Sequence, residues 1–100
     1  MPRTRADLLD SYRSYLALQR DLSRHTVRAY LVDISDLLSF LGVGEGDAEP
    51  VDTALATLDL ADLRDWLAAM AASGHSRATL ARRSASVRTF SSWAFETGLL

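Results

Sequence analysis

The sequence predicts an all-α protein, in which four helices form a compact bundle around one hydrophobic core. Apolar residues recur three or four positions apart in four segments. A capping residue precedes three of these segments, and a glycine follows three of them. A chain of 100 residues has room for one such core, so we assign residues 1–100 to a single domain.

The first two helices are predicted near the N-terminus. The first runs from about Arg5 to Arg20, with apolar positions at Leu8, Leu9, Tyr12, Tyr15, Leu16 and Leu18. The second follows the N-cap Ser23 and ends at Gly42. Its apolar face comprises Val27, Tyr30, Leu31, Ile34, Leu37, Leu38 and Leu41.

The other two helices are predicted after a glycine-rich, acidic loop that covers residues 42–58. Asp59 caps the third helix and Gly74 ends it. Its inner positions are Leu60, Leu63, Leu67 and Met70, flanked by Trp66. Ser76 caps the fourth helix, which runs to about Thr97, before Gly98. Its inner positions are Leu80, Val87, Phe90 and Ala94, with Trp93 alongside.

The formal net charge of −2 conceals a segregation of charge along the chain. Residues 1–28 and residues 66–100 each carry a net charge of +3, whereas residues 29–65 carry −8. Local fields, rather than net charge, attract polyanions. The two basic ends are therefore candidates for binding nucleic acid.

The fourth helix gathers four arginines next to hydroxyl side chains. At helical spacing, Arg77, Arg82 and Arg88 lie outside its apolar face. Arg83 points toward the core, where a charge needs a partner or must extend to the surface. The misfit of Arg83 marks it as a candidate functional residue.

The starts of the second and fourth helices carry the same chemistry. Ser23, Arg24, His25, Thr26 and Arg28 crowd one start, and Ser76, Arg77 and Thr79 crowd the other. Helix N-termini, hydroxyl groups and arginines bind phosphate oxygens, and arginines can also reach base edges. Two such starts could straddle a DNA groove, although solvated arginines and ordinary caps are the simpler reading of the same residues.

Other site chemistries find little support in the sequence. The chain has no cysteine, so a metal site would depend on His25 and His75, without a tight carboxylate cluster nearby. We read the Asp33/Asp36 and Asp59/Asp62/Asp65 carboxylates as helix starts and solvated faces. No cofactor motif, catalytic constellation, membrane span or signal peptide is visible, which favours a cytoplasmic protein.

Two motifs stand out at fixed spacing. The first is T-x-x-x-Y-x-x-D, at Thr26, Tyr30 and Asp33. The second is T-L-A-R-R-x-x-x-x-R-x-F, from Thr79 to Phe90, with Trp93 also in place. Together they resemble the N-terminal core-binding domain of tyrosine recombinases, most closely of the XerC type. The resemblance covers nearly the whole chain and implies a SAM-like four-helix fold whose second and fourth helices face DNA.

The resemblance also implies a function and a set of contacts. The parent protein would cut and rejoin DNA at specific sites, as in chromosome dimer resolution, alongside a related recombinase protomer. It implies no cofactor or metal, and the catalytic residues would lie in a C-terminal domain that this chain lacks, so no residue here is assigned as catalytic. The implied contacts with double-stranded DNA are Arg24, His25, Thr26, Arg28, Ser76, Arg77, Thr79, Arg82, Arg83 and Arg88.

The sequence departs from the family's usual pattern at two positions. Ser84 and Ser91 stand where the family usually has larger apolar residues, which predicts thinner packing if both are buried.

Two alternative functions stay open. One is a helical protein-interaction module, with the acidic middle of the chain as its interface. The other is a helix-turn-helix regulator built from the third and fourth helices.

Overall fold

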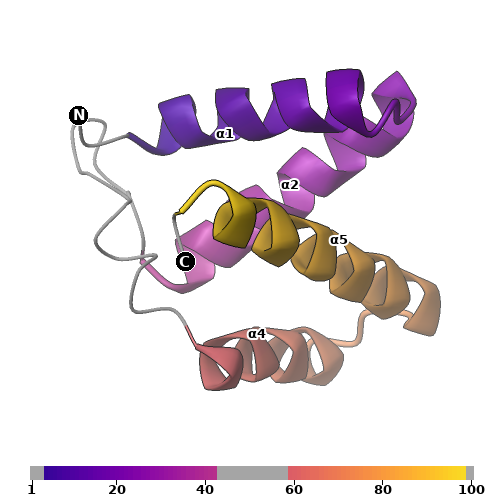
Figure 1. The fold of residues 1–100 in the computed structure, drawn as a ribbon. Helices are drawn as coiled ribbons and strands as arrows, with labels where there is room; N and C mark the ends of the chain where they lie inside the picture. The colour runs from indigo at the N-terminus through magenta and orange to yellow at the C-terminus, as the bar shows by residue number, and fades with distance from the viewer. Residues whose placement is uncertain (1–3, 43–58, 99–100) are drawn as a thin grey trace.

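The computed structural model describes residues 4–42 and 59–98, and these residues form an all-helical fold. The predicted acidic loop lies outside the described residues, apart from its first position. The elements are α1 (Arg5–Ser14), η1 (Tyr15–Gln19), α2 (Arg24–Phe40), α4 (Leu60–Ala72) and α5 (Arg77–Glu96). In Figure 1, α2 and α5 cross in the middle of the molecule, with α1 on one side and α4 on the other. The predicted fold class is confirmed.

The helix ends follow the local signals in the sequence. The side chains of Ser23, Asp59 and Ser76 each accept a hydrogen bond from the backbone N–H three residues later, as N-caps do. Gly74 has φ of +85° directly after α4, in the left-handed region that glycine adopts most readily. The three predicted caps are therefore confirmed.

The first predicted helix differs from expectation in its last turn. It continues as the π-helical turn η1, in which the backbone winds more widely than in an α-helix. Leu8, Tyr12 and Leu16 recur every four residues and are fully buried. Leu18 lies two positions beyond Leu16, about half a turn away, and is 81% exposed. Its predicted place on the apolar face is wrong.

Aromatic rings fill the core between α1 and α5. The Tyr12 ring packs edge-on against Phe90, with centroids 5.2 Å apart, and lies 5.0 Å from Trp93. Trp66, predicted to flank the inner face of α4, is instead fully inside the core. The buried apolar residues are Leu8, Tyr12, Leu16, Val27, Ile34, Leu37, Leu38, Trp66, Met70, Val87, Phe90, Trp93 and Ala94.

The partly buried residues complete this core. Leu9, Tyr15, Tyr30, Leu31, Leu41, Leu63, Leu67 and Leu80 pack against it. The side chain of Leu60, a predicted inner position, lies outside the described part of the structure. The remaining inner positions predicted for α2, α4 and α5 are thus buried or packed against the buried cluster.

Candidate nucleic-acid interface

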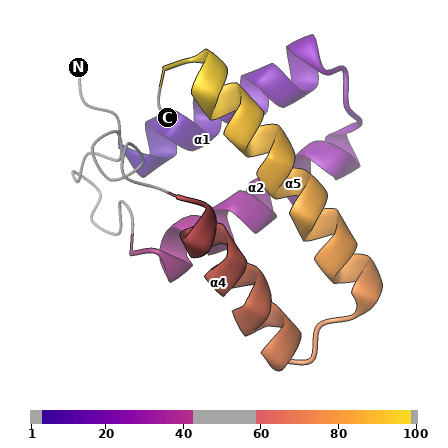
Figure 2. The same ribbon diagram turned by 60° about the horizontal axis from the view of Figure 1, so that its bottom comes forward.

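The starts of α2 and α5 have the same local geometry. The Ser23 hydroxyl accepts a hydrogen bond from the Thr26 backbone N–H at 3.1 Å and donates one to the Thr26 hydroxyl at 3.0 Å. Ser76 and Thr79 repeat both bonds at the same distances. Both starts lie on the same side of the molecule in Figures 1 and 2. The two predicted clusters therefore share one side of the fold.

Arg82 lies where α5 crosses α2, and it joins the two helices. Its Nε donates to Asp33 Oδ2 at 3.2 Å, and its Nη2 donates to Asp33 Oδ1 at 2.7 Å. The side chain nevertheless stays 43% exposed. Arg82 is thus held by α2 on one edge of its guanidinium and open to solvent elsewhere.

Asp33 corrects the prediction that the Asp33/Asp36 pair marks a solvated face. Asp33 is fully buried, and its Oδ2 accepts a hydrogen bond of 2.6 Å from the Ser86 hydroxyl. It lies on the side of α2 that faces α5, where donors from Arg82 and Ser86 converge. A buried carboxylate needs such partners, because burial without them costs much free energy.

Arg83 was predicted to need a partner because it points toward the core, and the structure pairs it with Asp36. Its side chain is 12% exposed, and its Nη1 donates to Asp36 Oδ2 at 2.9 Å. Its Nε lies 3.4 Å from Asp33 Oδ1, an ion-pair distance without hydrogen-bond geometry. The guanidinium also lies 5.6 Å from the Trp66 ring centroid, a cation–π distance. Arg83 therefore has little surface left for a ligand.

Asp36 and Trp66 extend this network from α2 to α4. The indole Nε1 of Trp66 donates to Asp36 Oδ2 at 3.0 Å. Asp36 thus accepts from α4 and α5 at once, although about half of its side chain remains exposed. Spacing alone did not single out Asp33, Asp36, Ser86 and Trp66 as a network. The signals in the sequence were the unpaired charge predicted at Arg83 and the place of Asp33 in the T-x-x-x-Y-x-x-D motif.

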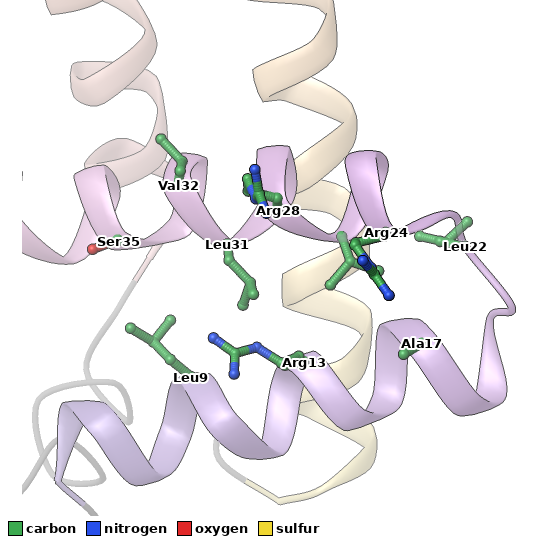
Figure 3. Close-up of a pocket in the computed structure, with 10 residues that line it drawn as sticks. Leu9, Arg13, Ala17, Leu22, Arg24, Arg28, Leu31, Val32 and Ser35 are labelled. Carbon is green, nitrogen blue, oxygen red and sulfur yellow. The ribbon is translucent and has the colours of Figure 1, made fainter.

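Arg24 and Arg28 lie on another face of α2. Both line a groove between α1 and α2 with a volume of about 630 Å³. Arg13 of α1 faces them across the groove, as Figure 3 shows. On the helix, this face is roughly opposite Asp33, so Arg24 and Arg28 do not join Arg82 in one cluster.

Arg88 occupies a third place, a groove between α4 and α5. Leu63, Arg64 and Leu67 of α4 line it, together with Ser84 and Ser91 of α5. Both serines are only partly buried, so their packing is not that of a closed core. The remaining predicted residues, His25 and Arg77, are exposed in the first turns of α2 and α5.

Residues 4–42 and 59–98 contain neither a metal-binding cluster nor a membrane-spanning helix. Among these residues, no group of three His, Cys, Asp or Glu side chains is placed to hold a metal ion. None of the helices formed by these residues is long and apolar enough to cross a membrane.

Comparison with known proteins identifies the family. The model of the phage integrase N-terminal SAM-like domain matches residues 9–98. The chain is 45% identical over 93 residues to tyrosine recombinase XerC of Mycobacterium sp. (strain JLS), a match that covers 93% of this chain. The XerC proteins of Mycobacterium tuberculosis (strain ATCC 25177 / H37Ra) and Mycobacterium bovis (strain BCG / Pasteur 1173P2) give the same identity and coverage.

The match is restricted to one part of those relatives. It spans 29% of each XerC protein, and no solved structure matches the chain. The resemblance inferred from the Thr26–Asp33 and Thr79–Phe90 motifs is confirmed. Since the family model covers nearly the whole sequence, the chain belongs to the phage integrase N-terminal SAM-like domain family.

Proposed function

We propose that the chain is the DNA-binding N-terminal domain of a site-specific tyrosine recombinase that cuts and rejoins DNA, in chromosome dimer resolution. The identity to XerC recombinases supports this assignment. We place catalysis in the part of the XerC relatives that this chain does not cover. The domain itself would supply affinity for double-stranded DNA and geometry, without a cofactor or a metal. A related recombinase protomer is its proposed partner, and the cytoplasm its proposed location.

The DNA surface is proposed to form around the starts of α2 and α5. The observation that carries this proposal is Arg82, a half-exposed arginine fixed at the crossing of these two helices. Thr26 and His25 at the start of α2, and Ser76, Arg77 and Thr79 at the start of α5, are proposed to add contacts from the two helix starts. Such hydroxyl, backbone and guanidinium donors fix the register of a duplex through its phosphates.

The other four predicted contacts are proposed to contribute to DNA binding in different ways. Arg24 and Arg28 would reach phosphates from its α1 edge, and Arg88 from the α4 side. Arg83 would contribute least to DNA binding, because Asp36 pairs with its charge and Trp66 covers its guanidinium.

A fluorescence-anisotropy titration of the 100-residue chain tests this function. Labelled duplex with a recombination half-site is compared with scrambled duplex at two salt concentrations. With four to six phosphate contacts, the log–log salt slope should be about −4 to −5. Arg82→Ala should weaken binding about tenfold. Leu18→Gln, on an exposed side chain of η1, is the matched control. Absence of salt-dependent binding would contradict the proposal for this chain.

The α1–α2 groove favours a second candidate function, protein interaction. Leu9 from α1 and Leu31 and Val32 from α2 line it, and none of its lining residues is acidic (Figure 3). Arg13, Arg24 and Arg28 border this apolar floor. We propose that a partner here would be an amphipathic helix with acidic flanks, because such a helix offers both matching chemistries.

This alternative is tested with a synthetic helical peptide that carries leucines on one face and glutamates on both flanks. Backbone NMR shifts should map to the groove and vanish in Arg13→Glu/Arg28→Glu. The same peptide with lysine in place of glutamate is the control. Equal binding of both peptides, or shifts elsewhere, would contradict the interaction.

The helix-turn-helix alternative is less well supported. Val87, Phe90 and Trp93 of α5 are buried, which makes α5 a central core helix rather than an exposed recognition helix.

A further inference from the structure

We propose that Asp33 is a positioning residue for DNA binding, and that it acts by fixing the Arg82 guanidinium at the α2–α5 crossing. This inference rests on the proposed function and adds to it a residue that cannot itself contact DNA. Asp33 is fully buried, so any effect it has on DNA must pass through a neighbour. Arg82 is the neighbour with exposed surface.

The carboxylate of Asp33 is itself held in place. Its Oδ2 accepts from the Ser86 hydroxyl at 2.6 Å and from Arg82 Nε at 3.2 Å. Its Oδ1 accepts from Arg82 Nη2 at 2.7 Å, with Arg83 Nε 3.4 Å away. Three side chains of α5 thus surround one carboxylate of α2, and the carboxylate has no freedom to follow a moving arginine.

The two bonds to Asp33 fix the plane of the Arg82 guanidinium. They engage Nε and Nη2, and they leave Nη1 without a hydrogen-bond partner among the described residues. A free arginine loses considerable side-chain entropy when it binds a ligand. An arginine that is already fixed loses less, which is the general benefit of preorganisation.

Positioning and simple electrostatics predict opposite results for one substitution. Asp33→Asn keeps the shape of the side chain but removes a negative charge beneath the DNA surface. If only charge matters, the variant should bind DNA more tightly, because the local field becomes more positive. If Asp33 positions Arg82, the variant should bind DNA more weakly. The amide of asparagine has one accepting oxygen and an NH2 group that only donates, so one of the two bonds from Arg82 is lost.

The experiment compares duplex binding by the 100-residue chain and its variants Asp33→Asn, Arg82→Ala and the double variant. We expect Asp33→Asn to bind about fivefold to tenfold more weakly, and the double variant to be no weaker than Arg82→Ala alone. Asp36→Asn is the matched control. It removes the same charge from the same network, but its partner Arg83 is nearly covered, so its affinity should be unchanged or higher.

If Asp33→Asn does not fold, Arg82→Lys tests the same positioning. Arg82→Lys retains the charge but has one nitrogen, which cannot span both carboxylate oxygens. It should lose nearly as much affinity as Arg82→Ala. Thermal melts of every variant confirm that it is folded at the assay temperature.

The outcomes separate this inference from the proposed function. Wild-type or tighter binding by Asp33→Asn or Arg82→Lys, with weak binding by Arg82→Ala, would overturn positioning and leave the DNA interface intact. Wild-type binding by Arg82→Ala would remove Arg82 from the interface, and the inference with it. If the wild-type chain bound no duplex at low salt, the proposed function itself would fail for this chain.

Discussion

Replacement of Tyr12 by phenylalanine should stabilise the fold. Tyr12 is fully buried, and its hydroxyl has no hydrogen-bond partner among residues 4–42 and 59–98. The ring packs against Tyr15, Phe90 and Trp93, with centroids between 5.0 and 6.1 Å away. Phenylalanine keeps these ring contacts and removes the unsatisfied hydroxyl.

The size of the effect follows from the cost of burying that hydroxyl. An unsatisfied buried polar group costs about 1–3 kcal/mol, and the lost oxygen leaves only a small void. We therefore expect the free energy of unfolding to rise by about 1 kcal/mol at pH 7. For a domain of this size, the melting temperature should rise by about 4–8 °C.

The stabilisation should grow in alkaline solution. Burial, aided by the neighbouring Tyr15 and Tyr30, raises the pKa of Tyr12 well above its ordinary value of 10.0. Above that pH the unfolded chain loses the Tyr12 proton while the folded chain keeps it. Proton release then favours the unfolded state, so the free energy of unfolding falls as pH rises. Tyr12→Phe lacks this loss.

Urea titrations at pH 7 and pH 10.5 measure both effects. Tyr15→Phe is the control, because its ring is only partly buried and water can reach its surface. A lower midpoint for Tyr12→Phe at pH 7 would refute the reasoning, since it would mean that the Tyr12 hydroxyl gains more from a bound partner than burial costs. An unchanged difference at pH 10.5 would refute the titration argument alone.

Three further substitutions test the packing and the turns, with thermal and urea unfolding as the readout. Trp66→Phe should cost about 2 kcal/mol, because it removes the indole donor to Asp36 from a buried site, and a cost below 0.5 kcal/mol would contradict that role. Gly74→Ala should cost about 1 kcal/mol from its positive φ alone, since an added Cβ meets nothing within 4 Å, and a gain in stability would contradict the turn geometry. Leu18→Gln should change stability by less than about 0.5 kcal/mol, and a larger loss would place Leu18 in a contact that its exposure does not indicate.

The helices were predictable because their signals are local. An N-cap acts on a backbone N–H three residues away, so the starts at Ser23, Asp59 and Ser76 could be read from short stretches of sequence. The apolar spacing that buries Leu8 and Phe90 is equally local. The π-turn after Ser14 was not predictable on these grounds, because α and π turns place similar apolar residues on the same side.

The sequence indicated which side chains gather at the two helix starts, but not on which faces of the fold they lie. The sequence indicated that Arg83 needs a partner, yet its partner Asp36 lies 47 positions away and depends on how α2 crosses α5. The same crossing buries Asp33, a charged residue for which its own helix offers no partner. The ten predicted DNA contacts were grouped by helix start, whereas the crossing sorts their arginines onto three faces.

Two roles are proposed for the arginines of α5, ion pairing within the fold and contact with DNA, and Arg82 is proposed to have both. Arg83 pairs with acids within the fold, and Arg77 is exposed at the start of α5. Arg82 binds Asp33 with one edge and is exposed on the other, so a loss of DNA affinity in Arg82→Ala combines a missing contact with a disturbed crossing. The two contributions separate on temperature: a missing contact persists far below the melting temperature, whereas a disturbed crossing weakens binding most as the variant approaches unfolding. An Arg82→Ala variant that regained wild-type affinity on cooling would thus be a stability variant, and one that did not would mark a true contact.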